Sequence, residues 1–337
     1  MKTVRLMPAD ASGCGYYRMI YPASACRDAG YPVVVDIDAK HEVVAKRNTQ
    51  TNEFKIVSGP ELPEDVIVFQ RPSTNRALAM VEYMKAQGHE IVVELDDNFY
   101  ALSARNQAWH AYQTADQNVV WLRRCCELAD RIVVSTPELG AVYQASAVVE
   151  NCVPELYLTI GRSPREDREM KVLGWSGTLA VHKDDLDVVG GGVDQALRTT
   201  RWPFYVIGEP NGVGEELGIG KVGGTGWMPM DKYPHAVAGL DLAIAPIADT
   251  AFNRSKSWLK PLEYAALGVP CVVSPSDEYR RLGVGRIATK PRHWKAALTA
   301  LMTSHQAYDE AVAEGLEIAE KWTYQANASR WYDAWAG

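Results

Sequence analysis

Residues 241–274 read DLAIAPIADTAFNRSKSWLKPLEYAALGVPCVVS. An apolar run opens this stretch and a polar loop follows it. A helical segment then ends at Gly268, before a second apolar run at residues 269–274. Two apolar strands joined by a helix are typical of a parallel sheet that is buried on both faces. The stretch therefore predicts an open α/β sheet.

The same alternation of short apolar runs and helical segments extends along the chain in two blocks. A polar, charged stretch with two prolines, residues 154–170, separates the blocks. At 337 residues the chain has the length of two domains of about 150 residues each. We therefore predict two Rossmann-like, doubly wound α/β domains that face each other across a cleft.

The predicted boundaries are an amino-terminal domain at 1–154, a linker at 155–170, a second domain at 171–305 and carboxy-terminal helices at 306–337. The last segment is rich in aromatic side chains, namely Trp322, Tyr324, Trp331, Tyr332 and Trp335. A terminal helix this apolar must dock on protein. We expect it to cross back to the first domain, and packing on its own domain is the alternative.

Bulk composition argues against several functional classes. The net charge is −7, with 15 Lys and Arg against 19 Asp and Glu in residues 1–154 and 20 against 23 in residues 155–337. Duplex DNA is therefore a disfavoured partner. Six cysteines form no CxxC pair, which argues against a zinc site or a disulfide framework. The start, MKTVRLMPAD, is no signal peptide and no apolar run is long enough to span a membrane, so we expect a cytoplasmic protein.

A glycine-bearing loop, DASGCGYYR at residues 10–18, follows the first predicted strand. Such a loop before a helix presents backbone N–H groups to an anion. The GxGxxG pattern of nicotinamide cofactor sites is not met, because Arg18 occupies the third glycine position. We predict that Gly13 and Gly15 let a ligand approach the backbone, with Arg18 near its charge. A plain tight turn is the alternative.

Acidic residues end the predicted strand at residues 91–95, where the sequence 94–97 reads ELDD. Carboxylates at the carboxyl end of a parallel strand lie at the edge where open sheets bind ligands. Asp96 and Asp97 are therefore candidates for metal binding, for sugar-hydroxyl binding or for proton transfer. Capping of the following turn is the alternative.

The loop GWSGT at residues 174–178 opens the second domain, and His182 follows it. Gly177 and Thr178 are suited to presenting N–H groups and a hydroxyl to a phosphate. His182 is a candidate for proton transfer, and capping of the next helix is the alternative.

The most informative segment is FNRSKSWLKPLEYAALGVP at residues 252–270. Its proline marks the start of a helix, which places Glu263 in the first turn. Arg254, Lys256 and Lys260 crowd the positive end of the helix dipole, where cations destabilise the helix. An anionic ligand such as a diphosphate would reverse that penalty. A surface helix with solvated lysines is the alternative.

Together these segments resemble glycosyltransferase family 4 and related GT-B enzymes, especially versions encoded by bacteria and their phages. The GCGYYR, ELDD and WSGT loops and the aromatic carboxy-terminal helix occur in that group in the same order as here. The resemblance implies an enzyme that moves a sugar from a nucleotide-sugar, UDP- or GDP-linked, to an acceptor hydroxyl. It further implies that no metal or other cofactor is needed, a protein as the favoured acceptor, and the host cytoplasm if the chain is phage-encoded.

The resemblance also implies roles for the candidate residues. Glu263 would bind the donor ribose, and Lys256 and Lys260 its diphosphate. The remaining donor-side residues are Arg254, Ser255, Gly177, Thr178 and Met228, the last in a loop near the base. The acceptor side comprises Gly13, Gly15, Arg18 and Asp96, and the catalytic candidates are Asp97 and His182. The family retains stereochemistry, but Ser255 stands where its first conserved glutamate would be.

Two other functions are compatible with the same fold. A sugar-nucleotide epimerase would convert the donor alone, so a product assay without acceptor separates it from a transferase. A protein that binds a nucleotide or sugar without turnover is the second alternative, because fold alone does not establish catalysis.

Overall fold

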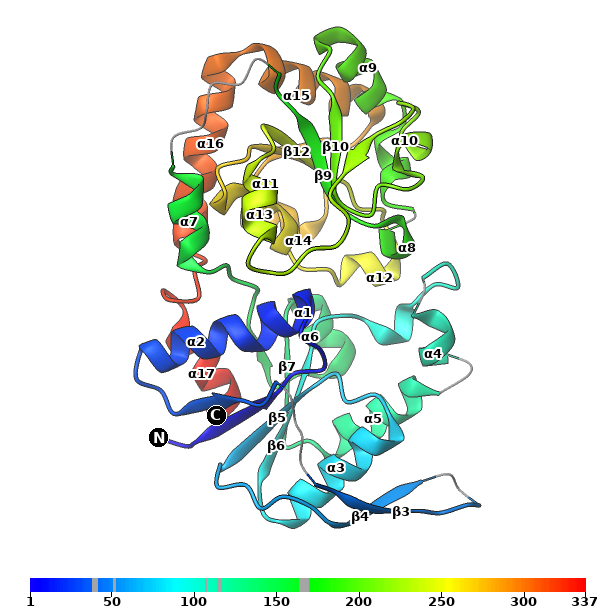
Figure 1. Cartoon of the computed structure of the whole chain (residues 1–337), viewed down its shortest axis with the longest axis vertical. Coiled ribbons are helices and arrows are strands. Elements are labelled where there is room, and N and C mark those ends of the chain that lie inside the picture. The colour runs from blue at the N-terminus through cyan, green and yellow to red at the C-terminus, as the bar shows by residue number, and fades with distance from the viewer. Residues whose placement is uncertain (38–41, 51–52, 107, 114–116, 164–169, 183) are drawn as a thin grey trace. The chain divides into compact units, whose positions relative to one another are not determined.

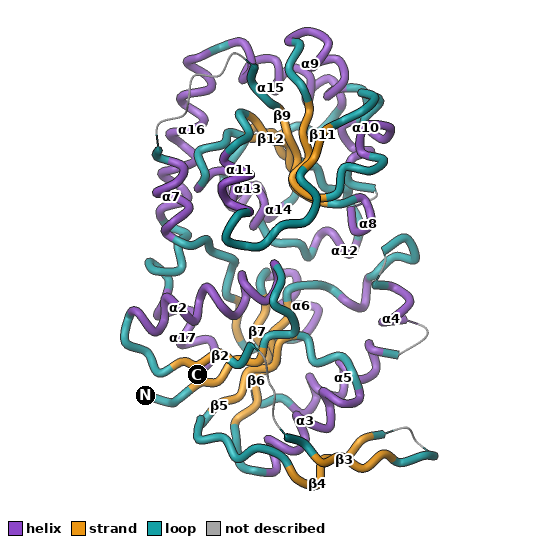
Figure 2. Tube along the Cα trace, viewed as in Figure 1, coloured by secondary structure: helices purple, strands orange, loops and turns teal. Residues whose placement is uncertain are grey.

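The computed structural model describes residues 1–37, 42–50, 53–106, 108–113, 117–163, 170–182 and 184–337. These residues form two compact units. The first comprises residues 1–104, 108–151 and 327–337, and the second comprises residues 105–107 and 152–326. Each unit is built on a six-stranded sheet in which every pair of neighbouring strands is parallel (Figures 1 and 2). This confirms the predicted α/β class.

The sheet of the first unit has the order β2-β1-β5-β6-β7-β8. Its strands are β1 (Val4–Met7), β2 (Val33–Val35), β5 (Val66–Gln70), β6 (Glu90–Leu95), β7 (Arg131–Val134) and β8 (Ala147–Val148). Residues 42–47 and 53–57 flank a polar turn and predict a hairpin, which is present as β3 (Val44–Arg47) and β4 (Phe54–Ser58), which pair antiparallel. All five residues of β5 are buried, as expected for a strand covered on both faces.

The helices of the first unit lie around this sheet (Figure 1). They are α1 (Gly13–Gly15), α2 (Tyr21–Asp28), α3 (Asn75–Ala86), α4 (Trp109–Gln113), α5 (Asn118–Leu128), α6 (Pro137–Tyr143) and α17 (Ala328–Ala336). A π-helical turn, η1 (Tyr16–Ile20), joins α1 to α2, and a 3-10 turn, η2 (Phe99–Ala101), follows β6. The sequence of residues 18–29, which ends before Gly30, predicts a single helix, so the π turn that carries Arg18 is a difference from this prediction.

The second sheet has the order β11-β10-β9-β12-β13-β14. Its strands are β9 (Leu173–Gly177), β10 (Phe204–Gly208), β11 (Gly223–Gly224), β12 (Leu242–Ala245), β13 (Cys271–Val273) and β14 (Arg286–Ile287). The chain first builds outward from β9 through β10 and β11, and then returns to the other side of β9 with β12. The strand order therefore reverses between β9 and β12, which is where ligands bind open α/β sheets.

The helices of the second unit lie on both faces of its sheet (Figure 1). They are α7 (Glu155–Gly161), α8 (Leu179–His182), η3 (Leu186–Val189), α9 (Gly192–Thr200), α10 (Val213–Glu216), α11 (Tyr233–Ala238), α12 (Ala251–Arg254), α13 (Leu259–Ala266), α14 (Asp277–Leu282), α15 (Pro291–Thr303) and α16 (His305–Glu320). On one face, Trp294 of α15 and Val193 of α9 are fully buried against Trp175 of β9.

Two predicted boundaries differ from the structure. Residues 155–170 were predicted as a linker, but α7 packs on α13 within the second unit. A Cβ on Gly161 would lie 2.2 Å from the carbonyl oxygen of Ala266, so this close packing requires a glycine. Residues 164–169 of the predicted linker lie outside the described residues.

The predicted return of residues 306–337 to the first domain holds only for their last part. Helix α16 packs on α13 in the second unit, where Gly315 permits the approach, while α17 belongs to the first unit. There the Tyr332 hydroxyl donates to the carbonyl oxygen of Lys2 at 2.8 Å, and its ring stacks on Tyr31.

Candidate functional site

The reversal point of the second sheet is formed by backbone that accepts no side chain. Gly177 ends β9 with φ = +154°, and Gly208 ends the neighbouring β10 with φ = +128°. A Cβ on Gly208 would lie 2.4 Å from the carbonyl oxygen of Gly177, and one on Gly177 would lie 2.6 Å from the Trp175 ring. Both positions therefore require glycine, because the neighbouring strand end and the Trp175 ring fill the space that a side chain would need.

Lys260 is the central cation at this edge. It lies in the first turn of α13, with its ammonium 5.3 Å from the centre of the Trp175 ring. Among the residues that the structure describes, none forms a hydrogen bond or ion pair with this ammonium. Burial lowers its pKa to about 8, although the charges of Asp185 and Glu263 oppose the fall. Without a ligand, this cation is therefore destabilised.

Glu263 lies one turn further along the same helix. It is only 5% exposed, and its Oε2 accepts a hydrogen bond from the Tyr233 hydroxyl of α11 at 3.2 Å. The next residue, Tyr264, contacts the end of β9 through its hydroxyl, which accepts from the Ser176 N–H at 2.9 Å and lies 2.8 Å from the Ser176 Oγ. These bonds fix the second turn of α13 against the end of β9. Glu263 lies in this turn and not in the first turn as predicted, because the helix begins at Leu259, before the proline.

Asp185 is a buried residue of this site that the sequence analysis missed. It is 3% exposed, and its Oδ1 accepts from the Ala248 N–H at 2.8 Å and from the Asn253 side chain at 2.7 Å. It therefore holds the loop that follows β12, and its charge acts on Lys260. No local motif marks it, because its partners lie 63 and 68 residues away in the sequence.

The three cations of the 252–270 segment have different surroundings. Arg254 ends the separate helix α12, and its exposed guanidinium pairs with Asp249 at 2.7 Å. The Lys256 ammonium lies over the Phe252 ring at 4.6 Å, and its charge lowers the pKa of Lys260. Lys256 and Lys260 are therefore electrostatic neighbours, whereas Arg254 is exposed at the end of α12.

The other predicted donor-side residues have different surroundings. Ser255 is 1% exposed and follows α12 directly. Thr178 is buried, and its hydroxyl accepts from the Ala180 N–H at 3.3 Å, which caps α8. Met228 is half-buried in the loop after β11. The backbone of His182 ends α8, but its side chain lies outside the described part of the structure.

In the first unit, the two predicted loop glycines differ. A Cβ on Gly15 would lie 1.9 Å from the carbonyl oxygen of Asp10, so this position admits only glycine. A Cβ on Gly13 would meet nothing within 4 Å. The loop's own backbone at Asp10 therefore explains why residue 15 is a glycine, whereas no neighbouring atom requires a glycine at residue 13.

Arg18 is a buried structural residue and does not face a ligand, which corrects the prediction. It is 1% exposed, and its Nε donates to Glu94 at 2.5 Å. Its Nη1 donates to the carbonyl oxygen of Val149 at 2.7 Å and to Asn151 at 2.9 Å, and its guanidinium lies over the Trp331 ring. Burial raises the pKa of Glu94 to about 7, against the opposing effect of Arg18.

Asp96 and Asp97 follow β6 directly, as predicted. The carbonyl oxygen of Asp97 accepts from the Tyr143 hydroxyl at 3.0 Å, and this hydroxyl in turn accepts from the Phe99 N–H at 3.0 Å. Both aspartates are half-buried. They lie at the carboxyl edge of the first sheet, which is the edge expected to bind ligands.

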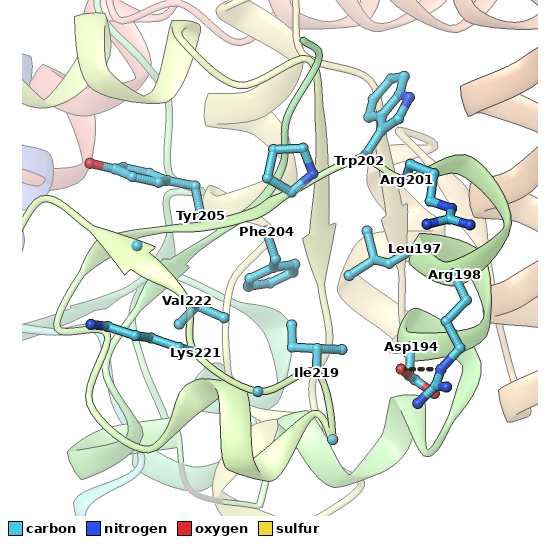
Figure 3. A pocket seen from close by; sticks show the side chains of 14 residues that line it. Asp194, Leu197, Arg198, Arg201, Trp202, Phe204, Tyr205, Ile219, Lys221 and Val222 are labelled. Carbon is cyan, nitrogen blue, oxygen red and sulfur yellow. Dashed lines mark hydrogen bonds and ion pairs between the residues drawn. The ribbon is translucent and has the colours of Figure 1, made fainter.

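A large pocket lies elsewhere on the second unit, at the amino ends of β10 and β11 (Figure 3). Its volume is about 970 Å³. Apolar side chains such as Leu197, Phe204 and Ile219 line it, together with Arg201 and Lys221. None of the predicted site residues lines this pocket, and the carboxyl ends of the strands lie at the opposite edge of the sheet.

The described residues contain no group of three or more His, Cys, Asp or Glu side chains placed to hold a metal ion. Within the same residues, no helix is both long and apolar enough to cross a membrane.

Comparisons with known proteins establish the fold. No protein-family model matches the chain, and no curated protein sequence matches it. Among solved structures, HepE of Anabaena in complex with UDP-glucose is similar over 100% of both chains, with a TM-score of 0.64 and 14% identity. Trehalose-6-phosphate synthase OtsA aligns with 100% of this chain and 99% of its own, with a TM-score of 0.66 and 10% identity.

A glycosyltransferase from Rickettsia africae is also similar, over 99% of this chain and 98% of its own, with a TM-score of 0.63 and 12% identity. These structural neighbours are GT-B glycosyltransferases, and they match over the full length. The chain therefore has the GT-B fold of two parallel α/β domains.

Proposed function

We propose that this chain is a glycosyltransferase that moves a sugar from a nucleoside diphosphate sugar to an acceptor hydroxyl. The observation that carries the proposal is the Lys260 ammonium, a destabilised cation with no ionic partner among the described residues, at the strand reversal of a GT-B second unit. A bound diphosphate would supply the missing negative charge. The fold supports the same conclusion, because its structural neighbours are glycosyltransferases.

In this proposal Lys260 and Lys256 bind the diphosphate, together with backbone N–H groups of the loop at Gly177 and Thr178 that follows β9. Glu263 accepts hydrogen bonds from the ribose hydroxyls, as acidic residues do in other Rossmann-like sites. When the glycosidic bond breaks, negative charge develops on the leaving nucleoside diphosphate. Lysine side chains that are already in place stabilise this charge without reorganising.

UDP is the first nucleotide to test, because the HepE structures contain UDP and UDP-glucose, and GDP is the second. The sugar transferred is a hexose or a pentose. We further propose that transfer retains the anomeric configuration and needs no metal, as the family 4 resemblance implies. Proton NMR of the product distinguishes retention from inversion, and turnover in EDTA tests the metal independence.

The resemblance also leads us to propose a cytoplasmic enzyme with a protein acceptor and with Asp97 and His182 as groups that position the acceptor or transfer its proton. Asp97→Asn and His182→Gln should each lower kcat and leave the dissociation constant of UDP unchanged. Weaker UDP binding in either variant would instead place that residue on the donor side.

The test of donor binding is a thermal-shift screen against UDP, GDP, ADP and TDP and their glucose conjugates, with NAD as the control ligand. We expect one nucleotide family to raise the melting temperature, and Glu263→Gln and Lys260→Met to reduce that rise. Lys295→Met is the matched control, because Lys295 is exposed on α15. Stabilisation by NAD alone, or by none of these ligands, would contradict the proposal.

The products formed from the donor distinguish a transferase from an epimerase and from a protein that only binds the donor. A transferase releases the nucleoside diphosphate when an acceptor is present, whereas an epimerase converts the donor sugar without an acceptor. Donor binding with neither product would indicate a protein that binds the donor without catalysis.

A further inference from the structure

A second cluster of charged side chains lies at the carboxyl edge of the first sheet. There the strand order reverses between β1 and β5, since β2 lies on one side of β1 and β5 to β8 lie on the other. Asp10 follows β1, Arg71 follows β5 and Asp96 follows β6. We call Asp10, Arg71 and Asp96 the Arg71 cluster.

The cluster is held rigidly by its neighbours. Arg71 forms an ion pair with Asp10, whose Oδ1 also accepts from the Ser12 N–H at 2.8 Å and from the Gly15 N–H at 3.2 Å. Gln70, which is 3% exposed, ties down the same loop through bonds to the Ala9 N–H and to the Cys14 carbonyl oxygen, both 3.0 Å long.

Arg71 also has an unusual backbone, with φ = +47°. Non-glycine residues with such angles are strained, and strained residues concentrate at ligand-binding sites. Burial alone would lower the pKa of Arg71, but the charges of Asp96 and Asp10 raise it. Both carboxylates therefore stabilise this guanidinium.

Two polar atoms of the cluster are buried and have no hydrogen-bond partner among the described residues. They are Oδ1 of Asp96 and Nε of Arg71. Buried polar atoms are normally paired, so one acceptor and one donor are available to a ligand here. A hydroxyl group satisfies both kinds of atom, because it donates one hydrogen bond and accepts others.

The charges decide which ligand fits. The Arg71 guanidinium is already neutralised by Asp10, and Asp96 and Asp97 add further carboxylates at the same edge. A phosphate or carboxylate ligand would be repelled by these groups. An uncharged hydroxyl-bearing ligand meets no such repulsion.

We propose that the Arg71 cluster binds the acceptor and selects uncharged hydroxyl-bearing molecules over phosphorylated ones. This inference rests on the proposed glycosyltransferase function and assigns the chemical class of its second substrate. Asp96 accepts a hydrogen bond from an acceptor hydroxyl, and Arg71 donates one.

Saturation-transfer NMR in the presence of saturating UDP tests the proposal. The uncharged probes are methyl α-glucoside, methyl α-mannoside and glycerol, and the phosphorylated probes are glucose 6-phosphate, mannose 6-phosphate and glycerol 3-phosphate. We expect at least one uncharged probe to bind at least tenfold more tightly than its phosphorylated counterpart. Asp96→Asn should weaken that binding about tenfold, because it removes a hydrogen bond to a charged group. In the same variant, the ratio between the dissociation constants of the phosphorylated and the uncharged probe should also become smaller.

The control variant is Asp28→Asn, which removes the same charge from an exposed position on α2 and should change neither quantity. Asp96→Ser repeats the test with a different side chain, and UDP binding measured on each sample shows that the protein is folded. Equal or tighter binding of phosphorylated probes, failure of all uncharged probes, or unchanged binding in both Asp96 variants would overturn the proposal. Failure of the wild-type chain to bind any nucleotide would instead refute the proposed function.

Discussion

Replacing Lys260 with methionine should stabilise the ligand-free protein while weakening donor binding. The fall in its pKa from 10.5 to about 8 corresponds to about 3 kcal/mol of unfavourable free energy at pH 7. Lys260 remains partly exposed, so solvent screening reduces the expected gain on substitution to about 2 kcal/mol. For a unit of this size that gain corresponds to a rise in melting temperature of roughly 4–8 °C.

The pH dependence identifies the cause of that gain. The pKa of Lys260 is lower in the folded state than in the unfolded state, so the unfolded chain binds more protons between about pH 8 and pH 10.5. The wild-type protein should therefore recover stability as the pH rises through this window, and the advantage of Lys260→Met should shrink. Differential scanning calorimetry at pH 7 and pH 10 measures both effects, with Lys295→Met as the control. A variant that is no more stable than wild type at pH 7, or whose advantage is the same at pH 10, would refute the reasoning.

Three further predictions concern other parts of the chain. Glu263→Gln should weaken UDP binding about tenfold or more, as measured by titration calorimetry. Its free energy of unfolding in urea should stay within about 1 kcal/mol of the wild-type value. Arg18→Met should cost about 3–5 kcal/mol at pH 8, because it leaves Glu94 buried without its cation, and the loss should shrink at pH 5, where Glu94 is protonated. If the loss in free energy of unfolding, measured in urea, is the same at pH 8 and pH 5, the ionised Glu94 is not its cause. Gly15→Ala should cost about 2 kcal/mol because its Cβ overlaps a backbone oxygen, and unchanged stability would show that the loop moves freely.

Local sequence patterns predicted the regular elements well. The strand at residues 66–70 and the strand at 242–245 have the bounds that their apolar runs predict, and each is fully buried. The hairpin at residues 42–57 and the alternation of strands and helices are also present. These features depend on side-chain periodicity and turn residues over short distances, which a single sequence displays directly.

Features that depend on contacts between residues far apart in the sequence were predicted less well. The segment after residue 154 looks polar enough for a linker, yet Gly161 packs against Ala266 and makes it part of the second unit. Helix α16 has no local signal that separates it from α17, so the point at which the chain re-enters the first unit was placed too early.

The candidate site shows the same limit. Glu263 and Lys260 stood out because they lie in one helical turn with a proline. Asp185 and Arg71 were missed because their partners lie more than 60 residues away. The sequence also suggested that Arg18 faces a ligand, whereas its guanidinium is buried against Glu94. A motif gives the residue type but not the direction in which its side chain points.

The most direct test of the central claim is the dissociation constant of UDP, measured by titration calorimetry at pH 7 and pH 9 for the wild-type protein and Lys260→Met. Because the free ammonium has a pKa of about 8, wild-type affinity should fall about tenfold between the two pH values, while the variant should bind weakly at both. Equal affinity of the two proteins, or a pH dependence that persists in the variant, would contradict a donor site centred on Lys260.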